Sequence, residues 1–261
     1  MKIIVCIKQV PDTKGGVKFN PDGTLDRGAM LAIMNPDDKA GLEAALRIKE
    51  QNGAEVTVIT MGLPKAADVL REALAMGADK AVLVTDRVLG GADTWATSTT
   101  LAGAIRNLEY DLIITGRQAI DGDTAQVGPQ IAEHLGIPQI TYAAAVDYCE
   151  ECGALIVKRE FEDRYQTLKV QGMCLVTILS TLAKPRYMNV WDIVAQDEKE
   201  VGFITFADLD LNKEDIGLGG SPTKVKSTAT KQFNKTIETL ELDPESAAKA
   251  IVDALKERHL I

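Results

Sequence analysis

The stretch Asp111-Leu-Ile-Ile-Thr-Gly-Arg-Gln-Ala-Ile-Asp-Gly-Asp-Thr-Ala-Gln-Val-Gly-Pro129 is the most informative part of the chain. It opens with an apolar run, Leu112 to Ile114, and turns at Gly116. It then becomes polar and acidic and leads into a helical pattern from Gln130. This is the order strand, loop, helix start. In parallel α/β sheets, ligands bind at the carboxyl ends of strands and anions bind at helix N-termini. The stretch therefore predicts a binding loop at the edge of a parallel sheet.

The same order of segments, an apolar run followed by an amphipathic run, repeats on either side of this stretch. Strands are expected over residues 2–10, 55–60, 81–85 and 111–115, and helices over 36–52, 65–76, 94–108 and 126–135. Such alternation predicts a mostly parallel sheet with helices on both faces, a three-layer α/β/α fold of the doubly wound type. Four strand-like segments follow over 139–148, 154–160, 165–170 and 175–179. Their short turns predict antiparallel additions at the sheet edge.

The chain divides into two parts by its patterning. Residues 1–196 are expected to form the α/β domain, with a small excursion over 18–25 around Pro21-Asp-Gly23. Residues 197–261 are polar and poorly patterned, and cannot build a core of their own. Within them a final helix is expected, with Asp243 as N-cap and Pro244 in the first turn. The second part therefore reads as a C-terminal extended arm.

Composition restricts the class of protein. The chain has 261 residues, 46% hydrophobic and 26% charged, which is ordinary for a globular protein. No apolar run reaches the ~18 residues of a membrane span, and the N-terminus does not resemble a signal peptide. The net charge of −9 disfavours binding to nucleic acid or to anionic membranes. A cytoplasmic protein without membrane insertion is expected.

Four cysteines without a signal sequence favour a reducing compartment. Cys149 and Cys152 have the spacing of a metal or redox pair. They lie among acids between two strand-like runs, however, and no second pair accompanies them. Two reduced thiols at a turn are the favoured interpretation.

The chain carries no familiar catalytic motif. It has no Gly-x-Gly-x-x-Gly after a strand, no Walker motif and no Gly-x-Ser-x-Gly elbow. Its two histidines, His134 and His259, are expected at the surface. No catalytic side chain and no metal site are therefore predicted, and any chemistry must be carried by a cofactor.

The loop Gly116-Arg-Gln-Ala-Ile-Asp-Gly-Asp-Thr-Ala-Gln-Val127 resembles the signature of the small (beta) subunit of electron-transfer flavoproteins. The resemblance extends to the first strand, to Asn35-Pro36, to Ala75-Met-Gly-Ala-Asp79 and to Lys184-Pro-Arg-Tyr187. It covers most of the chain and is weakest after about residue 200. It implies an adenine-nucleotide-binding fold and an arm that wraps a larger alpha subunit.

The resemblance also implies a nucleotide site. Loop residues expected in it are Gly116, Arg117, Gln118, Asp121, Gly122, Asp123, Thr124, Ala125, Gln126 and Val127. Residues expected to close its other sides are Cys6, Lys8, Asn35, Pro36, Asp37, Asp38, Met61 and Gly62. Phosphate contacts should come from backbone N–H groups and from Thr124, because carboxylates repel phosphate. Plainer roles remain open: turn hydrogen bonds for Asp121 and Asp123, and a helix cap for Asn35.

The segment Asp93-Thr-Trp-Ala-Thr-Ser98 separates two versions of the family. Ordinary members hold AMP and lack this polar motif. Electron-bifurcating members hold FAD, and this chain resembles them here and in Lys8-Gln-Val-Pro-Asp12. Asp93, Thr94, Thr97 and Ser98 are therefore expected to bind the second half of FAD. The alternative is a simple helix cap, with Thr97 and Ser98 in solvent.

These similarities imply a function as well. The expected protein is the beta subunit of an electron-bifurcating heterodimer, an electron carrier with NADH-dependent flavin oxidoreductase activity. Its FAD would accept a hydride from NADH and send one electron to ferredoxin or flavodoxin. The other would pass through the alpha-subunit FAD to an acyl-CoA dehydrogenase. The alternatives are an AMP-bearing docking subunit and an independent nucleotide sensor.

A docking loop is the last feature that the resemblance implies. In the family it anchors a dehydrogenase by an exposed apolar side chain. Val190 occupies that position here, with Trp191 beside it. The alternative is that Trp191 packs in the core.

Overall fold

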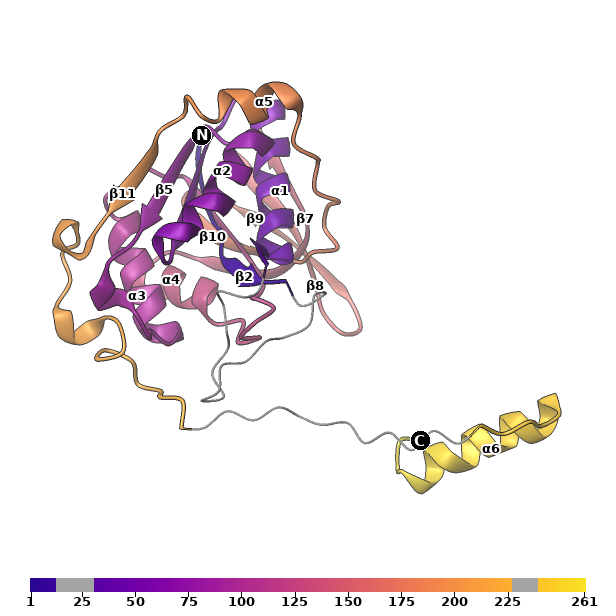
Figure 1. Ribbon diagram of the computed structural model, residues 1–261. Helices are drawn as coiled ribbons and strands as arrows, with labels where there is room; N and C mark the ends of the chain where they lie inside the picture. Colours follow the sequence, from indigo (N-terminus) through magenta and orange to yellow (C-terminus); the bar gives the residue numbers. More distant parts are fainter. Residues whose placement is uncertain (13–30, 227–238) are drawn as a thin grey trace. The chain divides into compact units, whose positions relative to one another are not determined.

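The central sheet has the strand order β11-β5-β4-β1-β6-β10-β7-β8-β9 in the computed structural model, which describes residues 1–12, 31–226 and 239–261 (Figure 1). The strands of this sheet, in chain order, are β1 Lys2–Cys6, β4 Glu55–Met61, β5 Lys80–Val84, β6 Leu112–Gly116, β7 Gln139–Cys149, β8 Ala154–Glu160, β9 Tyr165–Val170, β10 Cys174–Ile178 and β11 Val201–Ile204. The excursion expected over 18–25 lies outside the described residues.

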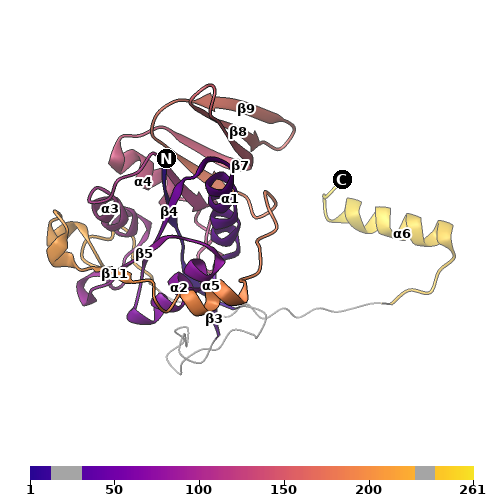
Figure 2. The same ribbon diagram turned by 90° about the horizontal axis from the view of Figure 1, so that it is seen from above.

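Helices cover both faces of this sheet (Figure 2). Successive side chains of a strand point to opposite faces, and β1 shows this directly. Ile3 and Val5 pack with one group of buried residues, which includes residues of α1 (Pro36–Asn52) and α2 (Ala67–Met76). Ile4 packs with the other group, which includes residues of α3 (Thr94–Ile105) and α4 (Val127–Leu135). The predicted three-layer α/β/α fold is confirmed.

Capping residues fix the bounds of the first helix. α1 spans Pro36–Asn52, with Asp37 and Asp38 in its first turn and Gly53 as a left-handed C-cap at φ 65°. Proline fits the first turn and acids suit the positive end of the helix dipole. The predicted range of 36–52 is confirmed. The helices that follow in this unit are α2 Ala67–Met76, α3 Thr94–Ile105, α4 Val127–Leu135 and α5 Val190–Ala195.

The first strand is shorter than predicted. β1 ends at Cys6, and β2 (Gln9–Pro11) pairs antiparallel with β3 (Ala32–Met34) in a separate small sheet. The backbone of Lys8 explains the break. Its N–H donates to the Asp38 carboxylate and its carbonyl accepts from Asn35 N–H, so neither group is available to a sheet neighbour.

The position of β10 corrects the expectation of antiparallel edge strands after residue 139. β10 lies between β6 and β7 and is parallel to both. All five of its residues are buried, as is typical of a strand that helices cover on both faces. The antiparallel pairing that was expected begins beyond β7, which pairs antiparallel with β8, as β8 does with β9.

The α/β unit extends further along the chain than residue 196. β11 pairs parallel with β5, and Leu209 and Ile216 are buried in the core beside α3. The chain divides into compact units at residues 1–226 and 227–261. Residues 201–226 therefore belong to the α/β unit. A few spaced apolar side chains are enough to add one strand to the existing edge of a sheet.

Cys149 and Cys152 form a disulfide at the turn between β7 and β8. This corrects the expectation of two reduced thiols. The hairpin turn brings the two Cα atoms to 5.4 Å, within the range that a disulfide requires.

The second unit contains α6, Pro244–Glu257, capped by Asp243 as predicted. Its side chains are not buried within the chain. In the described part of the chain, no helix combines the length and the apolar character that a bilayer span requires.

Candidate functional site

The candidate site lies where three neighbouring parallel strands end. Cys6 closes β1, Met61 closes β4 and Gly116 closes β6. In the sheet register Cys6 stands beside Ile59 and Thr115, so the three strand ends share one edge. The resemblance placed all three residues around the site, and the structure brings them to this edge.

The Asp38 carboxylate links the segment after β1 to the end of β6, where the loop begins. Its Oδ2 accepts from Lys8 N–H at 2.8 Å and its Oδ1 from Gly116 N–H at 3.0 Å. Burial raises the pKa of this carboxyl to about 7, outweighing the hydrogen bonds that favour the charged form. A Cβ on Gly116 would lie 2.3 Å from Asp38 Oδ1. Only glycine permits this approach, which explains Gly116 in the loop.

Asn35 holds the loop rather than capping α1. Its Nδ2 donates to Gln118 O at 2.8 Å, and its Oδ1 accepts from Ile120 N–H at 3.1 Å. It makes no side-chain cap bond to the helix. Lys8 adds a second tie, because its Nζ lies 2.7 Å from Asp121 Oδ1. Two predicted site residues thus position the loop from across the sheet edge.

The loop itself is shaped to present backbone N–H groups. Asp123 and Ala125 both have left-handed φ values, 48° and 53°. Gln118 Nε2 donates to Asp123 Oδ1 at 2.8 Å and stabilises this conformation. Residues that alternate between left- and right-handed conformations turn successive N–H groups toward one concave side, an arrangement that binds anions. Asp121 and Asp123 thus make local contacts, as the plainer interpretation held.

The loop leads directly into the N-terminus of α4. The helix begins at Val127 and places Pro129 within its first turn, where a missing N–H does no harm. The first N–H groups of a helix have no acceptor within it and carry the positive end of the dipole. A Cβ on Gly128 would lie 2.6 Å from Thr115 Oγ1, so α4 sits as close to β6 as glycine allows. The arrangement can hold a phosphate group.

Asp37 and Arg117 offer unused hydrogen-bonding groups beside this loop. Asp37 Oδ2 and Arg117 Nε are buried and form an ion pair, 3.5 Å apart. Neither atom has a hydrogen-bond partner among the described residues. Buried polar atoms that lack a hydrogen bond are costly. They fit a bound molecule with hydroxyl or amino groups.

The start of α3 meets this loop. Thr94 Oγ1 donates to Gln126 Oε1 at 2.8 Å. Asp93 is the N-cap, accepting from Ala96 N–H at 3.1 Å through Oδ1. Its Oδ2 accepts from Thr223 N–H at 2.9 Å and from Thr223 Oγ1 at 2.7 Å. Asp93 therefore acts as the cap that the alternative described, and also fixes the segment around Thr223.

Ser98 lies inside the molecule and not in solvent. Its hydroxyl donates to Trp95 O at 2.9 Å and stands 3.2 Å from both Gln130 Oε1 and His134 Nε2. Among the described residues, the Thr97 hydroxyl makes no hydrogen bond.

Polar side chains line the contact between α3 and α4, which the sequence analysis did not predict. Gln126, Gln130 and His134 recur every four residues, so they lie on one side of α4. His134 was expected at the surface, but its ring stacks edge-on against Trp95 at 4.8 Å. Burial lowers the pKa of His134, which favours the neutral ring. The four-residue spacing of these polar side chains was the feature of the sequence that could have predicted this contact.

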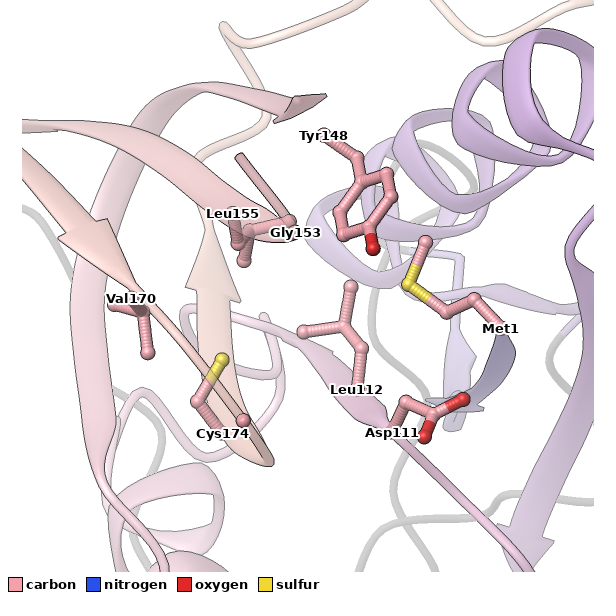
Figure 3. Close-up of a pocket in the computed structure, with 9 residues that line it drawn as sticks. Met1, Asp111, Leu112, Tyr148, Gly153, Leu155, Val170 and Cys174 are labelled. Carbon is pink, nitrogen blue, oxygen red and sulfur yellow. The ribbon is translucent and has the colours of Figure 1, made fainter. Parts of the chain in front are cut away.

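A cavity lies elsewhere, at the amino ends of the strands. It measures about 290 Å³ and includes Met1, Leu112 and Tyr148 in its lining (Figure 3). Met1 precedes β1 and Leu112 opens β6, so this cavity is at the opposite edge from the candidate site. It contains none of the predicted site residues.

The residues expected to dock a partner are exposed. Val190 is 72% exposed and Trp191 is 84% exposed, both at the start of α5. The alternative, with Trp191 packed in the core, is therefore wrong.

Known proteins share this sequence along its full length. The family described as "Electron transfer flavoprotein domain" matches residues 22–207. "Electron transfer flavoprotein subunit beta" of Clostridium acetobutylicum is 51% identical over 262 residues, covering 100% of both chains. "Caffeyl-CoA reductase-Etf complex subunit CarD" of Acetobacterium woodii is 47% identical, and "Acryloyl-CoA reductase electron transfer subunit gamma" of Anaerotignum propionicum is 45% identical, with the same coverage. The chain belongs to the electron-transfer flavoprotein family, as one of its beta subunits.

Proposed function

We propose that this chain binds FAD and serves an electron-bifurcating heterodimer with an alpha subunit. The observation that carries the proposal is the bond between Thr94 and Gln126, 2.8 Å long. It joins the start of α3 to the start of α4, so two helix N-termini meet at one sheet edge. The N-terminus of α4 can hold an anion. That of α3 is capped by the Asp93 carboxylate, so the Thr94 and Thr97 hydroxyls would hold a second phosphate there. AMP has one phosphate and needs one such place, whereas the two phosphates of FAD can use both.

The residues have distinct parts in this arrangement. The N–H groups from Thr124 to Gly128 hold the phosphate of the AMP half, with Thr124 adding its hydroxyl. Asp37 and Arg117, whose buried Oδ2 and Nε atoms face each other as an ion pair but make no hydrogen bond among the described residues, take hydroxyl or amino groups of the nucleotide. Thr94 and Thr97 face the second half of the cofactor, while Asp93 and Ser98 keep the start of α3 in place.

FAD, when bound, would supply all the redox chemistry, namely hydride acceptance from NADH and transfer of single electrons to ferredoxin or flavodoxin and, through the alpha-subunit FAD, to an acyl-CoA dehydrogenase. The chain's own part is to bind and orient the cofactor. Relatives named as parts of acryloyl-CoA and caffeyl-CoA reductase complexes support a partner that acts on CoA esters.

Nucleotide content tests the choice between FAD and AMP. The heterodimer, purified gently and reconstituted with FAD, should hold two FAD. Thr94→Val combined with Thr97→Val should reduce this toward one. Thr99→Val is the matched control, because its hydroxyl bonds Trp95 O further along the same helix and should leave the content at two. One FAD with one tightly held AMP would reject the proposal in favour of the AMP-bearing alternative.

We propose further that Val190 and Trp191 dock the dehydrogenase. Exposed apolar side chains that gather in one place mark partner sites. Val190→Ala should raise the dehydrogenase concentration needed for half-maximal electron transfer, without a change in flavin content. Equal titration curves for both proteins would remove Val190 from the docking site.

A further inference from the structure

The segment 184–199, here called the docking segment, carries the exposed side chains of α5. Three of them are more than half exposed: Val190 at 72%, Trp191 at 84% and Val194 at 66%. No residue of α5 is buried. A helix of six residues without buried side chains cannot hold its own position. Something outside the helix must therefore fix the segment.

Arg186 fixes the first end of the segment to α1. Its backbone N–H donates to Glu43 Oε2 at 3.1 Å, its Nε to the same oxygen at 2.8 Å and its Nη2 to Glu43 Oε1 at 3.2 Å. Its Nη1 and Nη2 also bond the carboxylate of Glu50. One guanidinium thus bridges two carboxylates almost two turns apart on α1.

The burial of Glu43 makes this contact more than a surface ion pair. The Glu43 side chain is only 5% exposed, whereas that of Glu50 is 59% exposed. Burial opposes ionisation of Glu43, but the hydrogen bonds from Arg186 outweigh it and leave the pKa of this carboxyl below its ordinary value. Exposed pairs contribute little to stability, whereas a buried charge that loses its partner is costly. Arg186 is therefore held firmly.

The other end of the segment is fixed to α2. Lys199 Nζ donates to Ala78 O at 2.8 Å, just beyond the C-terminus of the helix. Arg71 Nη1 donates to Gln196 O at 3.3 Å. α5 also lies beside α2 (Figure 1). The exposed side chains are thus carried on a short span between two anchors, one on α1 and one on α2.

We propose that Arg186 is a positioning residue for docking, which holds α5 in the conformation that the dehydrogenase binds. It acts through Glu43 and Glu50 and does not itself contact the partner. A segment already ordered in its bound conformation loses less entropy on binding. This role rests on the proposed docking function of Val190 and Trp191.

The test compares Arg186→Met with Arg47→Met in the complete heterodimer. Arg47 is a matched control because its Nε also pairs with Glu43, at 3.0 Å, but from within α1 and without contact to the docking segment. Arg186→Met should raise the KM for the dehydrogenase about tenfold while kcat and flavin content stay unchanged. Amide hydrogen exchange over 187–196 should become faster. Arg47→Met should change neither the KM nor the exchange.

Other variants separate positioning from general stability. Arg186→Lys should be intermediate, since a lysine can pair with Glu43 but cannot bridge to Glu50. If Arg186→Met fails to fold, Glu50→Gln removes only the exposed half of the bridge and should raise the KM by a smaller factor.

Hydrogen exchange separates the failure of this proposal from the failure of docking. Unchanged exchange in Arg186→Met, or an equal rise of KM in Arg47→Met, would overturn the positioning role. Faster exchange with an unchanged KM in both Arg186→Met and Val190→Ala would instead overturn the docking function on which the role depends.

Discussion

Asp38 holds together several parts of the candidate site, a role that the sequence did not predict for it. Its carboxylate accepts hydrogen bonds from the N–H of Lys8, which follows β1, and from the N–H of Gly116, which ends β6, while its own backbone lies in the first turn of α1. Its pKa nevertheless rises to about 7, since burial outweighs both bonds. The site is thus built on a carboxyl that changes charge near neutral pH.

Asp38→Asn should reveal this titration. The folded-state pKa of about 7 exceeds the ordinary 3.8, so the folded protein binds the proton more tightly. The contribution of Asp38 to stability is therefore complete below about pH 4 and decreases as the pH rises to 7, by at most about 4 kcal/mol. Asparagine also deprives one N–H of its acceptor, which lowers stability by about 1–3 kcal/mol at every pH.

The wild-type advantage in unfolding free energy should therefore shrink between about pH 4 and pH 7 and level off above that. Urea unfolding of both proteins across this range measures it. Parallel stability curves would show that Asp38 stays ionised throughout.

The cysteines should differ sharply in reactivity. Burial raises the pKa of Cys6 to about 12 and that of Cys174 to about 11, and the thiolate is the reactive form. Native protein should therefore give no rapid reaction with a thiol reagent. Mild reduction should expose only Cys149 and Cys152, which are joined in the disulfide, and Cys149→Ser with Cys152→Ser should abolish that response. A fast thiol before reduction would contradict the expectation.

At the scale of elements, the close packing of α4 on the sheet depends on Gly128. A Cβ there would lie 2.6 Å from Thr115 Oγ1 and 3.0 Å from Thr177 Cγ2, so Gly128→Ala must push the helix away from the sheet. We expect a loss of about 1–3 kcal/mol in unfolding free energy and weaker nucleotide binding, because the N-terminus of α4 moves. Gly122→Ala is the control for unfolding free energy, since its Cβ would have no neighbour within 4 Å. Urea unfolding of both variants and a nucleotide titration of Gly128→Ala measure the two effects, and an equal stability of the two variants would refute the argument.

Local chemistry made several elements predictable. Pro36 in the first turn and the Gly53 stop gave both ends of α1, because these signals act within a few residues. The loop after β6 and its approach to α4 followed from glycine and from the strand-to-helix pattern. The anchors of the loop could not be found in this way. Asn35 bonds Gln118 O across 83 positions, and only the folded chain brings them together.

The order of the strands in the sheet could not be predicted from the sequence either. The apolar run over 175–179 predicted a strand but not its place between β6 and β7, since pairing depends on long-range packing. β11 escaped notice for a related reason. Of its four residues, Val201 alone is buried, so its hydrophobic pattern is too weak to distinguish it from a loop.

At the scale of the whole molecule, the boundary between units comes after Lys226. The last part of the α/β unit is secured by Asp93, whose backbone N–H donates to Ser221 Oγ at 2.9 Å and whose carboxylate binds Thr223. Burial opposes ionisation of Asp93, but the hydrogen bonds from Thr223 and Ala96 outweigh it and lower its pKa. The segment that leads to the arm is therefore tied to the start of α3, beside the proposed second half of the cofactor site.

Removal of residues 227–261 should separate folding from assembly. The α/β unit has its own core on both faces of the sheet and keeps Ser221 and Thr223, so its unfolding free energy should stay within about 0.5 kcal/mol of that of the full chain. The arm, by contrast, contains a helix of 14 residues with no buried side chain, and Ile251 is 61% exposed. An isolated helix of this length is marginal in water, so its apolar side is expected to gain its packing from the alpha subunit. Sedimentation with that subunit should show loss of the heterodimer on truncation. A truncated chain that still assembles, or one whose core unfolds, would mean that the arm has a different role.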